Sequence, residues 1–170
     1  MSPPLLNVPS DAHTGRAFAC VIALVLGTMT NGCGSTPTAS EVPLGTILAS
    51  IDGVEFVAQR FIVATNVHGV LAIAAQVDDG RTIHLTMISP QRAAIVAVGA
   101  GEQNSAKTGY ERQMWSSNLA GGMGAVSVTN FASDHVEGTF SYTAVAVPGT
   151  SAAGQRVVVG RFNVAYTFRD

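Results

Sequence analysis

Cys33 is the side chain with the most clearly defined chemistry in this sequence. An apolar run, Ala17–Gly27, precedes it, and the small residue Gly32 stands directly before it. Arg16 lies just ahead of the run, and a positive charge followed by roughly 7–15 apolar residues is typical of a secretory signal peptide. The run is too short to span a bilayer, which takes about 20 apolar residues. We therefore expect residues 1–32 to be removed on export and the Cys33 thiol to be alkylated by a lipid.

The residues before Cys33 resemble the bacterial lipobox, in which a small residue precedes the lipidated cysteine. Thr30 and Asn31 depart from that motif, which has an aliphatic and a small residue at these positions. Cys20, the other cysteine, lies inside the apolar run, so the exported part would hold no disulfide. Lipidation would also remove a free thiol that is a liability in an oxidising compartment. The alternative is a plain signal peptide cut after Gly27, which leaves Cys33 as a free thiol.

Residues 33–44 are small, polar and interrupted by proline, so they bury too little apolar surface to order themselves. We expect them to be a flexible tether ahead of a single domain, residues 45–170. The formal net charge of −2 provides no basic field that would attract nucleic acid. Lys107 is the only lysine, so membrane attachment is expected through acyl groups on Cys33. Gly34, in the place of an aspartate, is compatible with sorting to an outer membrane if the host has one.

The candidate acid–base residues of the domain are His68, His84 and His135. A nucleophilic hydrolase needs a serine or cysteine beside a histidine oriented by a carboxylate, and often a GxSxG segment, which this sequence lacks. His84 and the pair Asp78 and Asp79 belong to one expected hairpin and could approach each other. A histidine on an outward strand face is, however, usually just solvated. We predict no catalytic residue and no enzyme.

Metal and phosphate motifs are also missing from the sequence. It has no HExxH or CxxC segment, so we predict no metal site and no cofactor. Calcium could use the oxygens of Asp78–Gly80 or Asp134, although Asp-Asp-Gly is better explained as turn chemistry. The glycine-rich segments Gly99–Gly101 and Gly121–Gly124 match neither GxGxxG nor GxxxxGK[ST], so they predict flexible loops or bulges.

Trp115 is the one candidate ligand-binding residue, in a group with Tyr110 and Met114. Aromatic side chains near glycine-rich loops can stack on sugars or anchor a partner. Tyr110 and Trp115 are five positions apart, so in one regular strand they would point to opposite faces. At least one of the two is therefore expected in the core.

The elements that position these residues have a hydrophobic period of two. Val158–Phe168 places six apolar residues or glycines on one side, and Gly138–Val147 does the same with Phe140, Tyr142 and two alanines. Asp52-Gly53 is the best two-residue hairpin signal in the chain.

Further strand candidates complete the expected sheet. Asp78–Gly80 predicts a second hairpin, in which Ile83, Leu85 and Met87 face inward. Further strands are expected over 93–98, 109–114 and 124–130, with the first of these central or covered on both sides. The fold class is therefore all-β, an antiparallel β-sandwich or small barrel of about 8–10 strands.

Several short motifs resemble a family of bacterial lipoprotein domains catalogued only as a domain of unknown function. They are Ile51-Asp-Gly53 with Phe56, Thr108-Gly-Tyr110, Gly124–Thr129, Val136–Tyr142 and Gly160-Arg-Phe162. The resemblance covers Ala49–Phe168 and implies an exported β-sandwich. The motifs are structural, with glycines at turns and aromatics on an inward face. No catalytic or binding residue follows from them.

Two classes of function remain open. The favoured one is a non-enzymatic binding or structural module of the cell envelope, which contacts a glycan, a wall polymer or another envelope protein. The alternative is a small barrel that carries an apolar ligand in its interior, and an envelope hydrolase is a third class. An open interior would favour the barrel, whereas a sandwich interior is packed solid.

Overall fold

The computed structural model describes residues 41–90 and 94–169, all within the second of the chain's two units, Pro37–Asp170. The expectations for the signal peptide, for Cys33 and for most of the tether therefore lie outside the described residues. The described residues form twelve strands and one strongly curled, half-barrel sheet, in which strand pairs are antiparallel except for β12 with β3. The strands are β1 (Thr46–Ile51), β2 (Val54–Ala58), β3 (Ile62–Val67), β4 (Val70–Gln76), β5 (Arg81–Ile88), β6 (Ala94–Gly99), β7 (Ser105–Tyr110), β8 (Gln113–Ser116), β9 (Met123–Phe131), β10 (His135–Ala146), β11 (Gln155–Ala165) and β12 (Thr167–Arg169). The predicted all-β fold is confirmed.

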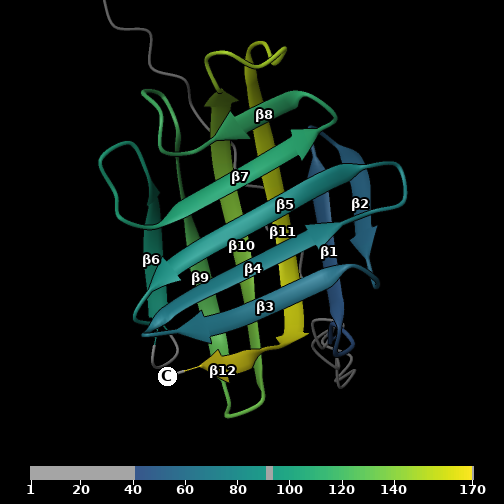
Figure 1. Ribbon diagram of the computed structural model, residues 1–170, viewed down its shortest axis with the longest axis vertical. Coiled ribbons are helices and arrows are strands. Elements are labelled where there is room, and N and C mark those ends of the chain that lie inside the picture. The colour runs from purple at the N-terminus through teal and green to yellow at the C-terminus, as the bar shows by residue number, and fades with distance from the viewer. Residues whose placement is uncertain (1–40, 91–93, 170) are drawn as a thin grey trace, which may run out of the picture. The chain divides into compact units, whose positions relative to one another are not determined.

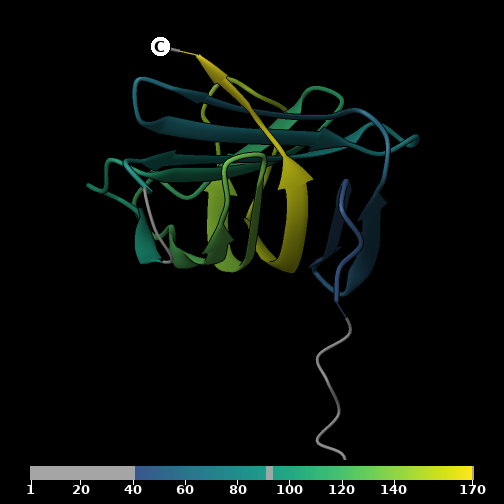
Figure 2. The same ribbon diagram turned by 90° about the horizontal axis from the view of Figure 1, so that it is seen from below.

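The curled sheet folds over itself into two layers. The first layer consists of β3, β4, β5, β7 and β8. It runs diagonally across the second layer, which consists of β10, β11, β1, β9 and β6 and lies behind it in Figure 1. Figure 2 shows the same layers from below, with β12 rising from the second layer towards the first. Strand β10 connects the layers, because it pairs with β11 along one edge and with both β9 and β8 along the other. The Tyr142 hydroxyl also crosses between them and donates a hydrogen bond to the Lys107 carbonyl at 3.1 Å.

The interior between the layers is filled by side chains from the alternating strands. Phe140 lies 6.0 Å from Tyr142 and 6.3 Å from Phe162, measured between ring centroids. On β5, Ile83, Leu85 and Met87 are buried while His84 is exposed, as the period of two predicts.

Two mid-strand glycines accept these phenylalanine rings. In the register of β10 with β11, Phe140 stands opposite Gly160 and Phe162 stands opposite Gly138. A Cβ added at Gly160 would come 2.5 Å from Phe140 Cζ, and one at Gly138 would come 2.6 Å from Phe162 Cζ. Both glycines were expected to belong to a structural motif. They act by leaving space under a ring on the neighbouring strand rather than by forming a turn.

The two predicted hairpins are confirmed. Asp52 and Gly53 connect β1 to β2 with positive φ angles of 51° and 83°, as a type I′ turn requires. Strands β4 and β5 pair across the Asp78–Gly80 turn, with Gln76 opposite Thr82.

Two of the other strand predictions need correction. The segment 109–114 is not one strand, because β7 ends at Tyr110 and β8 begins at Gln113 after a tight turn at Glu111, whose φ is 53°. Strand β6 is not central, since among the described strands it pairs with β9 alone, and Ile95 is 77% exposed. A run of apolar residues predicts burial on both faces only if neighbouring strands and layers cover it, and here they do not.

The C-terminal strand is also shorter than its alternation predicts. Phe162 is buried as expected, but Phe168 is 62% exposed. The chain leaves β11 after Ala165, where the Tyr166 backbone N–H donates to the Asp134 carbonyl and the Tyr166 hydroxyl donates to the Ala132 carbonyl at 2.7 Å. It continues as β12, which pairs in parallel with β3. Strand β3 was not among the predicted strands. In the described part of the chain, no helix has the length and hydrophobicity needed to cross a membrane.

Candidate functional site

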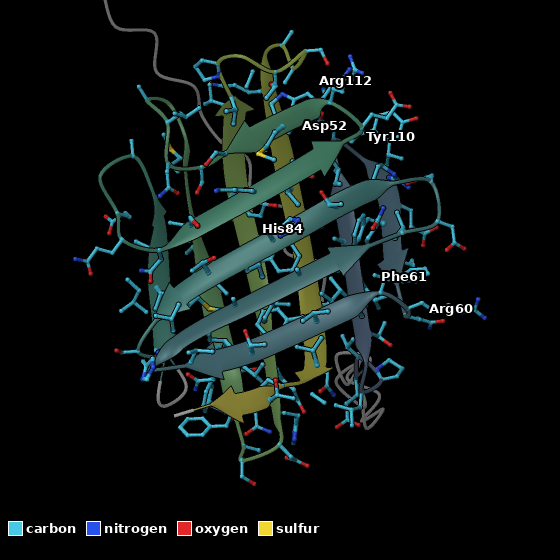
Figure 3. The ribbon with its side chains drawn as sticks, viewed as in Figure 1. Asp52, Arg60, Phe61, His84, Tyr110 and Arg112 are labelled. Atoms are coloured by element: carbon cyan, nitrogen blue, oxygen red, sulfur yellow. The ribbon has the colours of Figure 1, made fainter. Side chains whose placement is uncertain are left out.

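A pocket of about 320 Å³ lies where three hairpin turns meet at one end of the two layers. Its lining comes from the β1–β2 turn, from the first residue of β5, from both sides of the β7–β8 turn and from β11. Figure 3 shows Asp52 and Tyr110 at this end. We call this cavity the hairpin pocket. Its apolar lining is Ile51, Val54 and Trp115, and its charged lining is Asp52, Arg81 and Arg156.

Asp52 ties the first hairpin to β11. Its Oδ1 accepts a hydrogen bond from the Val157 backbone N–H at 2.7 Å, and its Oδ2 accepts one from Arg156 Nη1 at 2.9 Å. The backbone N–H of Asp52 in turn donates to the Val157 carbonyl at 2.8 Å. The carboxylate is therefore fixed by both backbone and side-chain partners, and it holds the Arg156 guanidinium at the pocket wall.

Trp115 forms part of the pocket wall from within the core. It is only 3% exposed, and its indole N–H donates to the Ala153 carbonyl at 3.1 Å. The Arg156 guanidinium carbon lies 4.5 Å from the centroid of the Trp115 ring, within the range of a cation–π contact. Much of the ring is thus already covered by protein. A role of Trp115 in ligand binding stays a prediction, and the structure places the residue in the lining.

Tyr110 and Trp115 lie on the same side of the sheet, not on opposite sides. They belong to two paired strands, and Thr108, two residues before Tyr110, stands opposite Trp115. The side chain of Met114 points to the other face and is exposed. The charge of the Glu111 carboxylate, together with a hydrogen bond to it, raises the pKa of the Tyr110 hydroxyl.

Arg81 enters the pocket from the start of β5 and is oriented by Asp79. One carboxylate oxygen of Asp79 accepts the Arg81 backbone N–H at 2.9 Å, and the other accepts Arg81 Nε at 2.7 Å. The backbone hydrogen bond from Arg81 is the main cause that lowers the pKa of Asp79. The Arg81 Nη1 atom, in contrast, is buried and has no hydrogen-bond partner among residues 41–90 and 94–169. The Asp-Asp-Gly turn therefore uses Asp79 to fix an arginine.

The three histidines of the domain lie on separate elements. His68 is in the β3–β4 turn, and His84 lies on β5 opposite Lys107. Partial burial of the ring, followed by the charge of Lys107, lowers the pKa of His84. His135 begins β10, and its Nδ1 lies 2.8 Å from Asp134 Oδ1, which raises the pKa of the imidazole. Among the described residues, no group of three or more His, Cys, Asp or Glu side chains is placed to hold a metal ion.

A second hollow, the outer groove, lies on the outer face of the second layer. Its volume is about 680 Å³, and its lining comes from β1, β6, β9, β10 and β11. Ile95, Leu48 and Val159 give it an apolar character, while serine and threonine side chains lie between them. It is broad and open, so it offers a surface rather than an enclosed site.

The sequence pointed to Trp115 and its neighbour Tyr110, which both line the pocket, but not to Arg81 and Arg156. Arg81 and Arg156 each follow a loop and carry no motif of their own. The signal that was available is Asp52-Gly53, which places a carboxylate at this end of the sheet. Its partner Arg156 stands 104 positions later in the chain, and only the pairing of β1 with β11 brings the two together.

Residues 45–164 match the family model described as Domain of unknown function (DUF6252). Comparison with curated proteins gave no match, and comparison with solved structures gave none either. This match confirms the predicted membership in a domain family of unknown function. It does not test the predicted lipid anchor. Because the matched residues make up well over half of the sequence, the chain belongs to the DUF6252 family of domains of unknown function.

Proposed function

We propose that this chain is an exported, lipid-anchored domain of the bacterial cell envelope that binds a ligand and carries out no reaction. The anchor is Cys33, which follows the apolar run and Gly32. Several acyl chains on this cysteine would hold the protein firmly, since each buried methylene contributes about 0.8 kcal/mol. Residues 33–44 would then connect the lipid to the sheet.

The observation that carries this proposal is the position of the hairpin pocket relative to the tether. The Val42 carbonyl accepts a hydrogen bond from the Asn163 side chain at 2.9 Å, so the chain enters the domain beside the first residue of β1, Thr46. The hairpin pocket contains Ile51 and Asp52, at the other end of the same strand. At roughly 3.3 Å per residue, the two ends of β1 lie roughly 17 Å apart. The pocket is therefore at the end of β1 opposite to the one where the chain enters the domain.

The polar groups of the pocket favour binding over catalysis. Arg156 is paired with Asp52, and Arg81 is held by Asp79, so these charges are fixed in position and suit recognition. None of the residues that line the pocket is a histidine, and His84, although it lies on β5 like Arg81, points to the exposed face of that strand. The filled interior also argues against a barrel that carries an apolar ligand, since Phe140, Tyr142 and Phe162 occupy the space between the layers.

Labelling with an alkynyl fatty acid in the bacterial host tests the anchor. The wild-type chain is expected to take up the label and Cys33→Ser to take up none, because the thioether needs the Cys33 sulfur. Cys20→Ser is the matched control, since Cys20 lies in the segment that is removed, and it should be labelled like the wild type. Equal labelling of Cys33→Ser and the wild type would contradict the proposal.

A further inference from the structure

We propose that the hairpin pocket binds a small carboxylate with a short apolar or aromatic body. This inference rests on the proposed binding role and names the chemical class of the ligand. Two guanidinium groups line the pocket, and each is held by one carboxylate, Arg81 by Asp79 and Arg156 by Asp52. The remaining wall includes Ile51, Val54 and Trp115, which would contact an apolar body.

The Arg81 guanidinium supplies the main argument. Asp79 binds its Nε, which fixes the plane of the group, while Nη1 is buried without a hydrogen-bond partner in the described part of the chain. A buried donor of this kind is rare in folded proteins unless a water or a ligand satisfies it. A guanidinium N–H forms a charge-assisted hydrogen bond to a carboxylate oxygen, so a carboxylate in the pocket would supply the acceptor that Nη1 lacks.

Arg156 supplies a second, independent contact. Asp52 holds its Nη1 at 2.9 Å, and the group lies over the Trp115 ring with 4.5 Å between the guanidinium carbon and the ring centroid. The guanidinium is therefore positioned before a ligand arrives, which lowers the entropy that binding must overcome.

The size and lining of the pocket favour a carboxylate over a more highly charged anion. A volume of about 320 Å³ lies at the lower end of the range for small-molecule sites. Asp52 in the wall opposes a dianion such as a phosphate monoester more strongly than it opposes a singly charged carboxylate. The apolar wall would in turn select against a strongly hydrated ligand.

Trp115 is the only tryptophan of the chain, so its fluorescence reports directly on the pocket. The experiment titrates the full chain, purified in detergent, with acetate, butyrate, benzoate and 3-phenylpropionate, and with the primary amide of each acid. Isothermal titration calorimetry provides a second readout of the same equilibria. We expect at least one of the two acids with an aromatic body to bind about tenfold or more tightly than its amide, because the amide cannot pair with the arginines.

Three variants localise the effect. Arg81→Gln and Arg156→Gln are each expected to abolish the preference for acid over amide, and the second variant covers the case in which the first fails to fold. Arg112→Gln is the matched control, since Arg112 is exposed on the β7–β8 turn outside the pocket lining, and it should keep the preference.

The proposal is overturned if none of the four acids binds, if acids and amides bind equally, or if Arg112→Gln loses the preference as Arg81→Gln does. These outcomes concern the ligand alone. Failure of the anchor would appear as an unlabelled wild-type chain in the fatty-acid experiment, so the two failures can be told apart.

Discussion

Replacing Gly160 by alanine is expected to lower the free energy of unfolding by about 1–3 kcal/mol, because the new Cβ has no room on β11. It would come 2.5 Å from Phe140 Cζ and 2.7 Å from the Cβ of Ala49. The Phe140 ring or the β1 backbone would have to move, and both belong to a closely packed interior. Urea denaturation followed by Trp115 fluorescence measures the loss.

Val159→Ala is the control for this substitution. Val159 is the adjacent residue of the same strand but is 50% exposed, so its truncation should change the free energy of unfolding by less than about 0.5 kcal/mol. Phe140→Leu combined with Gly160→Ala should cost less than the sum of the two separate substitutions, since the shorter side chain leaves space for the Cβ. Strict additivity, or equal stability of Gly160→Ala and Val159→Ala, would show that the ring does not need the glycine.

Replacing Trp115 by alanine is expected to have the largest effect on stability, a loss of about 3–5 kcal/mol. The substitution opens a cavity at a residue that is 3% exposed, removes the hydrogen bond to the Ala153 carbonyl and leaves the Arg156 guanidinium without the ring beneath it. Because the variant has no tryptophan, its unfolding is followed by circular dichroism.

Trp115→Phe is the matched control for this prediction. It keeps an aromatic ring in the same place and loses only part of the volume and the indole N–H, so a clearly smaller loss is expected. If Trp115→Ala and Trp115→Phe were equally stable, the indole could not be part of the core. The comparison also guides any ligand screen, since weaker binding by Trp115→Ala would reflect a damaged core as well as a lost contact.

The strands that the sequence predicted best are those whose alternation decides which face is buried. Over 83–87 of β5 and 136–144 of β10, apolar residues or glycine alternate with polar residues, and in both strands the apolar side is the buried one. The Asp52-Gly53 turn was equally clear because a type I′ turn strongly prefers such a pair.

Elements without such local signals were missed or misplaced. Strand β3 follows Phe61, whose φ of 52° is unusual for a phenylalanine and is set by the surrounding chain. Strand β12 exists only because it pairs with β3, more than 100 residues earlier, so no local pattern indicates it. Phe168 continues the alternation of β11 in sequence, but the bend at Tyr166 ends that strand first.

Only separate parts of the hairpin pocket could be predicted, because strand pairing between distant segments brings its residues together. Trp115 and the Asp-Gly and Asp-Asp-Gly turns were each visible in the sequence, but their convergence depends on the pairing of β1 with β11 and of β5 with β7. Arg81 looks like an ordinary residue at a strand start. Its Nη1 is buried without a partner among the described residues, and only the packed structure shows this.

The mass of the intact protein extracted from membranes tests the central claim, an exported domain held by lipid, most directly. The account predicts a mature chain that begins at Cys33 and carries the added mass of its acyl groups, so that residues 1–32 are absent. A chain recovered without acyl mass, or one that begins at another residue, would contradict it.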